Sequence, residues 1–419
     1  MAIGYACLTI GVPCSDLSRC ILKNASDENL RKIIHSNLSA LETMIDYNMK
    51  NDIQLFRISS DIIPFASHPV NTIRWWEDYQ DTFRRIGTKI KQAGMRVSMH
   101  PGQYTVLNSG DERVVKNAIK ELEYHARLLD ALGVEQSGKL ILHIGGVYGD
   151  KEQAMRQFIT NYFGLPDMIK RRLVIENDDK NYNIQEVLEI STATGAPVVF
   201  DNLHHKVNPP KVLRSETDWI QACKKTWGTK DGKQKIHYSQ QKENAPAGAH
   251  SDTICSKDFL AFYKSLPDQN IDIMLEVKDK NLSAVKCTNI ILSENIRDKI
   301  KQEWERYEIF IQSRSQTLSD IVKALMEEDG DITLAFYNCI EKALTLPMDL
   351  DFGIAAALQI WEDYFRKDCT NTEKNRFVKL LREFREGKGT LKSIKNHLLK
   401  CAARRNIAYL VNSLYFYID

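Results

Sequence analysis

Histidines and carboxylates recur along the first two thirds of the chain, each at or near the end of a short apolar run. MRVSMH ends in His100, for example, and LVIEND carries Glu176. Imidazole and carboxylate groups bind metal ions and transfer protons. A single such residue is usually structural, but the repetition indicates one shared site. The full set is His100, His143, Glu176, Asp201, His204, His237, His250 and Glu276, and Lys235 lies in the same run as His237.

A cluster of buried carboxylates repels itself unless cations lie between them. Mixed His, Asp and Glu ligands without thiolates suit zinc, manganese or iron, and several carboxylates favour a site with bridged metal ions. Such a site lowers the pKa of bound water and stabilises the entering and leaving oxygens of phosphoryl transfer. Phosphodiester hydrolysis is therefore the first reaction class indicated. Sugar isomerisation and amide hydrolysis stay open, although IGYAC lacks the His-x-His with which amidohydrolases usually begin.

These side chains need a scaffold that brings distant strand ends together. Eight short β-branched or apolar runs alternate with segments of helical period: AIGYACL, IQLFRISS, MRVSMH, KLILHIGG, RRLVIEND, APVVFDNLHH, KQKIHYS and IDIMLEVKDK. Eight strands alternating with helices over roughly 290 residues predict a (β/α)8 TIM barrel, in which catalytic groups gather at the C-terminal strand ends. A doubly wound open sheet is the alternative, but no G-x-G-x-x-G follows the first run.

Composition indicates an ordinary globular protein, with 43% hydrophobic and 27% charged residues and a formal net charge of +2. Nine scattered cysteines form no C-x-x-C pair, which argues against disulfides and a cysteine zinc site. The N-terminus lacks a basic region before its weakly apolar run, and no stretch is long enough to span a bilayer. We expect a monomeric, cytoplasmic protein that makes no membrane contact.

The pattern changes near residue 295, where strand signals stop. We therefore predict a barrel domain over 1–295 and a separate all-α domain over 296–419. Residues 371–405 contain eleven Lys or Arg against three Asp or Glu. Such a segment is either a solvated helical face or a surface for nucleic-acid phosphates. A role for the helical domain in binding DNA or a protein partner is left open.

Several long motifs resemble the UV damage endonuclease family, whose barrel is similar to that of endonuclease IV. They are GYAC, FRISSDIIPFASHP, SMHPGQY, ILHIGGVYG, IENDD, PVVFDNLHH, KIHYSQQ and PGAH, in this order, from about residue 3 to about residue 280. The resemblance implies two or three divalent metal ions, manganese first, with zinc or another metal open. It also implies nicking of damaged double-stranded DNA immediately 5′ of cyclobutane dimers, 6-4 photoproducts and some abasic sites.

The resemblance also assigns roles by position. Metal ligands fall on His100, His143, Glu176, Asp201, His204, His237, His250 and Glu276. Catalytic groups fall on Glu176, Lys235 and His68, and Lys235 matches a lysine that can be carboxylated. Gln103 and Tyr104 match a pair that wedges into the duplex, and Tyr5 matches an aromatic residue near the extruded nucleotides. Leu8-Thr9 stands where the family often has Asn, a departure on the first strand.

Two alternatives stay open beside this hypothesis. One is a general apurinic/apyrimidinic endonuclease of the endonuclease IV type. The His-Pro-Gly-Gln-Tyr stretch argues against it, because an enzyme that reads only an abasic gap needs less of a wedge. The other is a damage-binding protein without activity. Retention of every expected ligand position argues against that.

Overall fold

The structure, a computed structural model, describes residues 1–291 and 296–418. The chain forms two compact units, each described below by itself. The first consists of Met1–Thr9, Cys14–Ile254 and Asp258–Thr288, and the second of Ile10–Pro13, Cys255–Lys257 and Asn289–Asp419. The predicted domain boundary after residue 295 falls at the edge of 292–295, outside the described residues, and stays a prediction.

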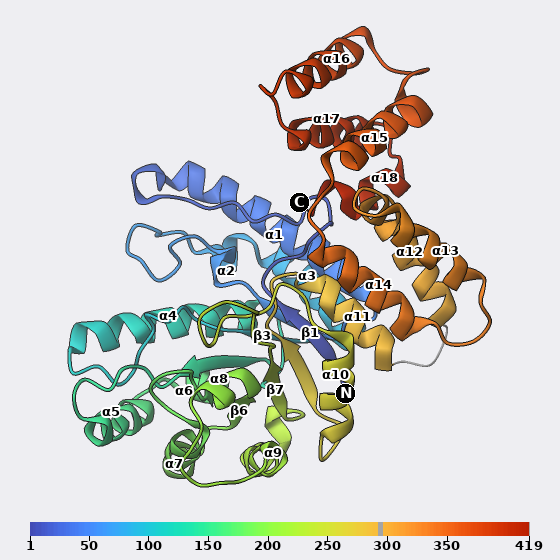
Figure 1. Cartoon of the computed structure of the whole chain (residues 1–419). Coiled ribbons are helices and arrows are strands. Elements are labelled where there is room, and N and C mark those ends of the chain that lie inside the picture. The colour runs from blue at the N-terminus through green and yellow to red at the C-terminus, as the bar shows by residue number, and fades with distance from the viewer. Residues whose placement is uncertain (292–295, 419) are drawn as a thin grey trace. The chain divides into compact units, whose positions relative to one another are not determined.

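The first unit is built around a closed barrel of eight parallel strands in the order of the sequence (Figure 1). The strands are β1 (Ile3–Ala6), β2 (Leu55–Ile58), β3 (Arg96–Met99), β4 (Lys139–His143), β5 (Leu173–Glu176), β6 (Val198–Asp201), β7 (Lys235–Tyr238) and β8 (Asp272–Leu275). β1 pairs with both β2 and β8, which closes the barrel. The predicted (β/α)8 barrel is confirmed.

Helices surround the strands and cover their outer sides (Figure 1). The longer ones are α1 (Asp27–Lys50), α3 (Gln80–Gln92), α4 (Glu112–Ala131), α5 (Lys151–Phe163), α7 (Ile184–Thr194), α9 (Glu216–Lys224), α10 (Ser256–Ser265) and α11 (Asn281–Ile291), and the short ones are α2 (Trp75–Asp78), α6 (Asp167–Lys170) and α8 (Asn202–Val207). Local sequence sets their ends. Asn183 forms a capping box with Glu186 at the start of α7, and Gly195, with φ of 76°, ends it.

The described residues of the second unit form helices joined by loops and contain no strand, as predicted. Its helices are α12 (Ile296–Gln312), α13 (Gln316–Glu327), α14 (Thr333–Thr345), α15 (Leu350–Ile360), α16 (Asn371–Arg385), α17 (Leu391–Arg404) and α18 (Ala408–Asn412). Phe310, Phe336 and Leu398 are among its fully buried side chains. In the part of the chain that the structure describes, no single helix is long and apolar enough to cross a membrane; α14 together with Leu350–Phe365 reaches that length only as a pair bent by 112°.

Candidate metal centre

The predicted ligands come together because the parallel strands carry them to the same end of the barrel. His143, Glu176 and Asp201 are the last residues of β4, β5 and β6. His100 follows β3 directly, and Glu276 follows β8. In the sheet, His143 is the register partner of Glu176. The topology alone therefore converts positions spread over much of the chain into one site.

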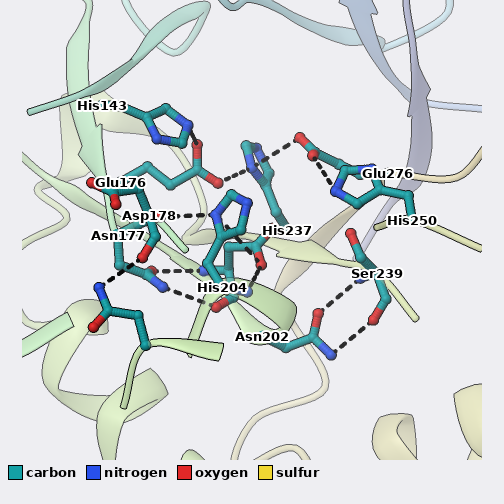
Figure 2. A network of polar contacts seen from close by, with 12 residues as sticks. His143, Glu176, Asn177, Asp178, Asn202, His204, His237, Ser239, His250 and Glu276 are labelled. Carbon is teal, nitrogen blue, oxygen red and sulfur yellow. Dashed lines mark hydrogen bonds and ion pairs between the residues drawn. The ribbon is translucent and has the colours of Figure 1, made fainter. Parts of the chain in front are cut away.

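Glu176 lies at the middle of this site, fully buried (Figure 2). Its Oε2 lies 3.3 Å from Nε2 of His100 and 3.3 Å from Nε2 of His143. Its Oε1 lies 2.5 Å from Nδ1 of His237 on β7. One carboxylate thus faces three imidazoles that come from three different strands.

Glu276 is a second carboxylate on the opposite side of His237 (Figure 2). Its Oε1 lies 3.3 Å from Nδ1 of His237, and its Oε2 lies 3.8 Å from Nε2 of His250. The buried guanidinium of Arg57 on β2 also pairs with Glu276. Sequence reasoning missed Arg57, although a lone Arg inside the apolar run LFRI was a usable signal.

Asp201 and His204 form the third part of the site. Asp201 begins α8, and its side chain accepts a hydrogen bond from the backbone N–H of His204 at 2.7 Å. Asp201 Oδ1 lies 3.7 Å from Nδ1 of His204. Asn177 bonds the backbone of Asp201 in both directions, at 3.0 and 3.1 Å, and so fixes the end of β6 against the residue that follows β5. Asn177 was also missed, because an Asn after a strand usually marks only a turn.

Three groups of ligand atoms, each within 4.8 Å of one another, share Glu176. They are His100–His143–Glu176, Glu176–Asp201–His204 and Glu176–His237–Glu276. Seven of the eight predicted ligands belong to these groups. The eighth, His250, contacts Glu276, which is one of the seven. The three groups could therefore hold metal ions, and Glu176 belongs to each of them.

The donor set fits metal ions on a second ground. Glu176 Oε2, Asp201 Oδ2 and His237 Nε2 are buried and have no hydrogen-bond partner among the described residues. Buried polar atoms are normally paired, since an unpaired one costs about 1–3 kcal/mol. These three atoms can be satisfied by a divalent cation that accepts nitrogen and oxygen ligands.

Backbone carbonyls orient two of the imidazoles. His100 Nδ1 lies 3.0 Å from Pro101 O, and His204 Nδ1 lies 2.9 Å from Asn177 O. A ring nitrogen that donates to a carbonyl fixes the tautomer and leaves Nε2 as the free lone pair, which is the usual arrangement of metal-binding histidines.

Burial and neighbouring charges shift the pKa values of the site in different directions. Burial alone would raise the pKa of Glu176, but the facing imidazoles, His237 foremost, hold that pKa well below its usual range. Burial raises the pKa of Asp201 and lowers the pKa of His100 to about 4. Burial opposes the charge of His204, but the combined attraction of Asp201, Glu176 and Glu276 outweighs it and raises the pKa of His204 to about 9. Three imidazoles are thus held near a carboxylate that stays ionised.

Lys235 is also fully buried, two residues before His237 on β7. Its Nζ has no hydrogen-bond partner within residues 1–291 and 296–418. Burial, reinforced by the positive charge of Arg96, holds the pKa of Lys235 well below its usual range. The amine is therefore kept largely uncharged and nucleophilic.

The predicted wedge residues lie at the surface. Tyr104 is 69% exposed, and Gln103 is exposed as well. A cavity of about 300 Å³ adjoins Tyr104 and is lined by His68, Ser67 and Glu121. His68 is exposed and belongs to none of the three ligand groups found in the described chain. Its Nδ1 accepts a hydrogen bond from the backbone N–H of Val70 at 3.1 Å.

The position of Tyr5 corrects the expectation that it contacts extruded nucleotides. Its side chain is fully buried, its ring packs on Phe56, and its hydroxyl donates to Asn48 Oδ1 of α1 at 2.8 Å. Successive strand residues point to opposite sides, and α1 lies on the outer side of the barrel. Tyr5 therefore faces the helix layer and packs there; Thr9 contacts the same hydroxyl at 3.1 Å.

Two family models match the chain. The model of UV-endonuclease UvdE matches residues 3–306, and a model described as a protein of unknown function, DUF1722, matches residues 310–418. The first match includes every residue of the candidate metal centre.

Curated relatives carry the name UV DNA damage endonuclease. One from Clostridium perfringens is 40% identical over 387 residues, covering 91% of this chain and 92% of that protein. One from Bacillus cereus is 34% identical over 264 residues, covering 62% of this chain and 82% of that protein. An alignment of 387 residues is longer than the UvdE match, so the similarity to the Clostridium protein must extend into the helical region.

A solved structure, that of SacUVDE, is 40% identical in sequence to this chain. The two superpose with a TM-score of 0.66, over 70% of this chain and 98% of that one. The similarity supports the same barrel.

Proposed function

The chain belongs to the UV-endonuclease UvdE family, and from that premise we propose that it nicks damaged double-stranded DNA. The phosphodiester hydrolysed lies immediately 5′ of a cyclobutane dimer or 6-4 photoproduct, and some abasic sites are also cleaved. The observation that carries the proposal is the set of three ligand groups that share Glu176. That arrangement suits phosphodiester hydrolysis at bridged metal ions.

The residues that would hold the ions are the eight predicted ligands. We propose two or three divalent ions, manganese first, with zinc as the alternative, because the donors are nitrogen and oxygen only. When bound, such ions activate water and stabilise the charge on the entering and leaving oxygens. Glu176 would orient the surrounding ligand side chains, since its Oε2 faces His100 and its Oε1 faces His237.

Other residues of the chain would act on the duplex around this centre. Tyr104 and Gln103, exposed beyond the ligand His100, would fill the gap that displaced bases leave. Lys235, with its nucleophilic buried amine, meets the chemical requirement for carboxylation, which would turn an uncharged amine into an anion near the ligands. His68 lies in the cavity beside Tyr104, where it would contact substrate and not the ions.

All residues proposed for this activity lie in the barrel region, 1–295. A contribution of the helical region to DNA or protein binding remains a proposal, as do a monomeric state and a cytoplasmic location. The basic residues of α16 and α17 support the DNA alternative.

The test compares three plasmids: ultraviolet-irradiated, depurinated and untreated. The purified protein with Mn²⁺ is expected to convert irradiated supercoiled plasmid to the nicked circle, and untreated plasmid far more slowly. Nicking of depurinated plasmid alone would establish the general apurinic/apyrimidinic endonuclease instead. Retention of irradiated plasmid without any nicking, in either metal, would favour the inactive damage-binding protein.

A further inference from the structure

A polar stripe runs along the buried side of α4. Glu121, Tyr124 and His125 are all buried, at 7%, 5% and 0% exposure, and they stand three and four residues apart, so they share one helical face. Their neighbours on that side are apolar, among them Leu122 and Leu128. Burying a carboxylate on such a face costs free energy unless hydrogen bonds or a positive charge satisfy its oxygens. The partners of Glu121 therefore indicate what its side chain does.

Glu121 joins two loops at the barrel mouth. Ser67, in the loop after β2, donates a hydrogen bond to Glu121 Oε2. Tyr104, in the loop after β3, directs its hydroxyl to Glu121 Oε1 at 3.5 Å, at the long limit of a hydrogen bond. Both contacts lie at the rim of the 300 Å³ cavity that also contains His68.

The rest of the stripe holds the beginning of the first loop and the end of β3. Tyr124 donates to Ser60 O at 2.8 Å and accepts from Ile63 N at 3.3 Å. His125 Nε2 lies 2.8 Å from Ser60 Oγ, which in turn contacts His100 O at 3.0 Å. One helical turn of α4 is thus connected both to the wedge tyrosine and to the backbone of a candidate metal ligand.

Gly102 accommodates the tyrosine from the other side. A Cβ at Gly102 would stand 2.4 Å from Cε1 of Tyr104, which is closer than real atoms approach. The ring therefore lies directly over the bare backbone of Gly102 while its hydroxyl reaches Glu121. Although Tyr104 is mostly exposed, these two contacts fix where its ring stands.

We propose that Glu121 is a positioning residue for lesion recognition, which holds the ring of Tyr104 in place at the barrel mouth before DNA binds. It touches none of the candidate metal ligands and acts through Tyr104. The proposal rests on the proposed function, because positioning matters only if Tyr104 enters a damaged duplex. A Tyr104 side chain that is already held in its binding conformation loses less conformational entropy when DNA binds.

The test is a double-mutant cycle with Glu121→Ala and Tyr104→Phe, and with Glu121→Gln as the conservative variant. Loss of one hydrogen bond to a charged group corresponds to about a tenfold effect. We expect Glu121→Ala and Tyr104→Phe each to raise KM for irradiated duplex about tenfold, with kcat changed less than about twofold. The double variant should be no worse than either single one. Glu121→Gln keeps an acceptor oxygen and should recover most of the loss.

A matched control is Glu112→Gln, because Glu112 lies on the same helix with an 87% exposed side chain and should leave KM unchanged. Additive effects of Glu121→Ala and Tyr104→Phe, or equal losses in kcat and kcat/KM, would overturn the proposal. Tyr104→Phe removes only the hydroxyl of a mostly exposed side chain, so it tests the proposal even if Glu121→Ala fails to fold. An unchanged KM in that variant would also overturn the proposal. Running the same cycle on abasic duplex distinguishes a failure of the proposed function from a failure of the positioning role of Glu121. Nicking of abasic duplex alone would refute the proposed function, while the cycle would still decide whether Glu121 acts through Tyr104. If no substrate is nicked, the same cycle in Kd for irradiated duplex decides it.

Discussion

At the scale of single residues, Glu176 is the side chain on which the candidate site depends. It belongs to all three ligand groups, and it is fully buried between imidazoles. Glu276 and Asp201 each belong to only one group. Removal of the shared carboxylate should therefore disturb every metal position at once.

Glu176→Gln should lower nicking of irradiated DNA by about 10²–10³-fold, the loss seen when a preorganised polar group of an active site is removed. The amide keeps the shape but not the charge, so bound metal measured by elemental analysis should fall as well. Glu152→Gln is the control, since that side chain is 86% exposed on α5. Full nicking by Glu176→Gln would remove this residue from the mechanism.

Tyr5 provides a different residue-scale prediction. Because its hydroxyl bonds Asn48 inside the molecule, Tyr5→Phe should leave nicking and lesion affinity within about twofold while lowering stability by about 1 kcal/mol. Urea unfolding and nicking measured on the same preparation would check both parts. A large loss of lesion affinity with unchanged stability in Tyr5→Phe would indicate that Tyr5 contacts DNA directly.

At the scale of elements, the sequence was sufficient to predict the barrel and the strand ends at which His, Asp and Glu side chains gather. Apolar runs ending in His, Asp or Glu specify both the strand and the side chain at its C-terminal end, and parallel order then brings the ends together. The direction of Tyr5 was not predictable in this way, because a fully buried strand such as IGYA lacks the polar–apolar alternation that distinguishes its two sides. The α4 stripe was missed for a related reason: Glu121 and His125 read as surface residues of a charged helix.

The contact between α1 and α3 should make stability depend on acid pH. Hydrogen bonds from Arg85 lower the pKa of Glu42 to about 2, against an ordinary value of 4.5. A lowered folded-state pKa means that the stabilisation is present above about pH 4.5 and is lost as pH falls toward 2. The pair is partly exposed, so the effect should stay below about 1 kcal/mol. Denaturant midpoints between pH 5 and pH 3 should fall less in Glu42→Gln than in the parent protein; equal slopes would contradict this.

The basic surface of α16 should contribute to DNA binding if it meets phosphates. Lys374, Arg382 and Arg385 are exposed and stand eight and three residues apart, so they follow one side of the helix. Replacing all three by alanine should weaken binding to any duplex and reduce the slope of log K against log salt by up to about 0.9 per lost contact. Lesion preference should stay unchanged. An unchanged slope would leave α16 without a role in DNA contact.

At the scale of the whole molecule, the chain joins a barrel of known family to a helical region whose family model carries no function. Both regions are shared with a relative that is similar over 91% of the chain. The chain forms two compact units, and each has a buried core. We propose that the first unit carries the chemistry and that the second unit contributes additional binding.

Chelation should lower both the activity and the stability of the intact protein. Treatment with EDTA should abolish nicking, and Mn²⁺ should restore it, because the clustered carboxylates need cations to act. The melting temperature should fall on chelation, since ions that bind only the folded state stabilise it. Unchanged activity and melting temperature after complete metal removal would exclude a metal centre at Glu176.

The central claim is tested most directly on an end-labelled duplex that carries one cyclobutane dimer at a known position. With Mn²⁺, the intact protein should make a single cut at the phosphodiester immediately 5′ of the dimer and leave a 3′-hydroxyl, and Glu176→Gln should make none. A duplex left intact while an abasic control is cut would contradict the account. So would cleavage by Glu176→Gln at the parent rate.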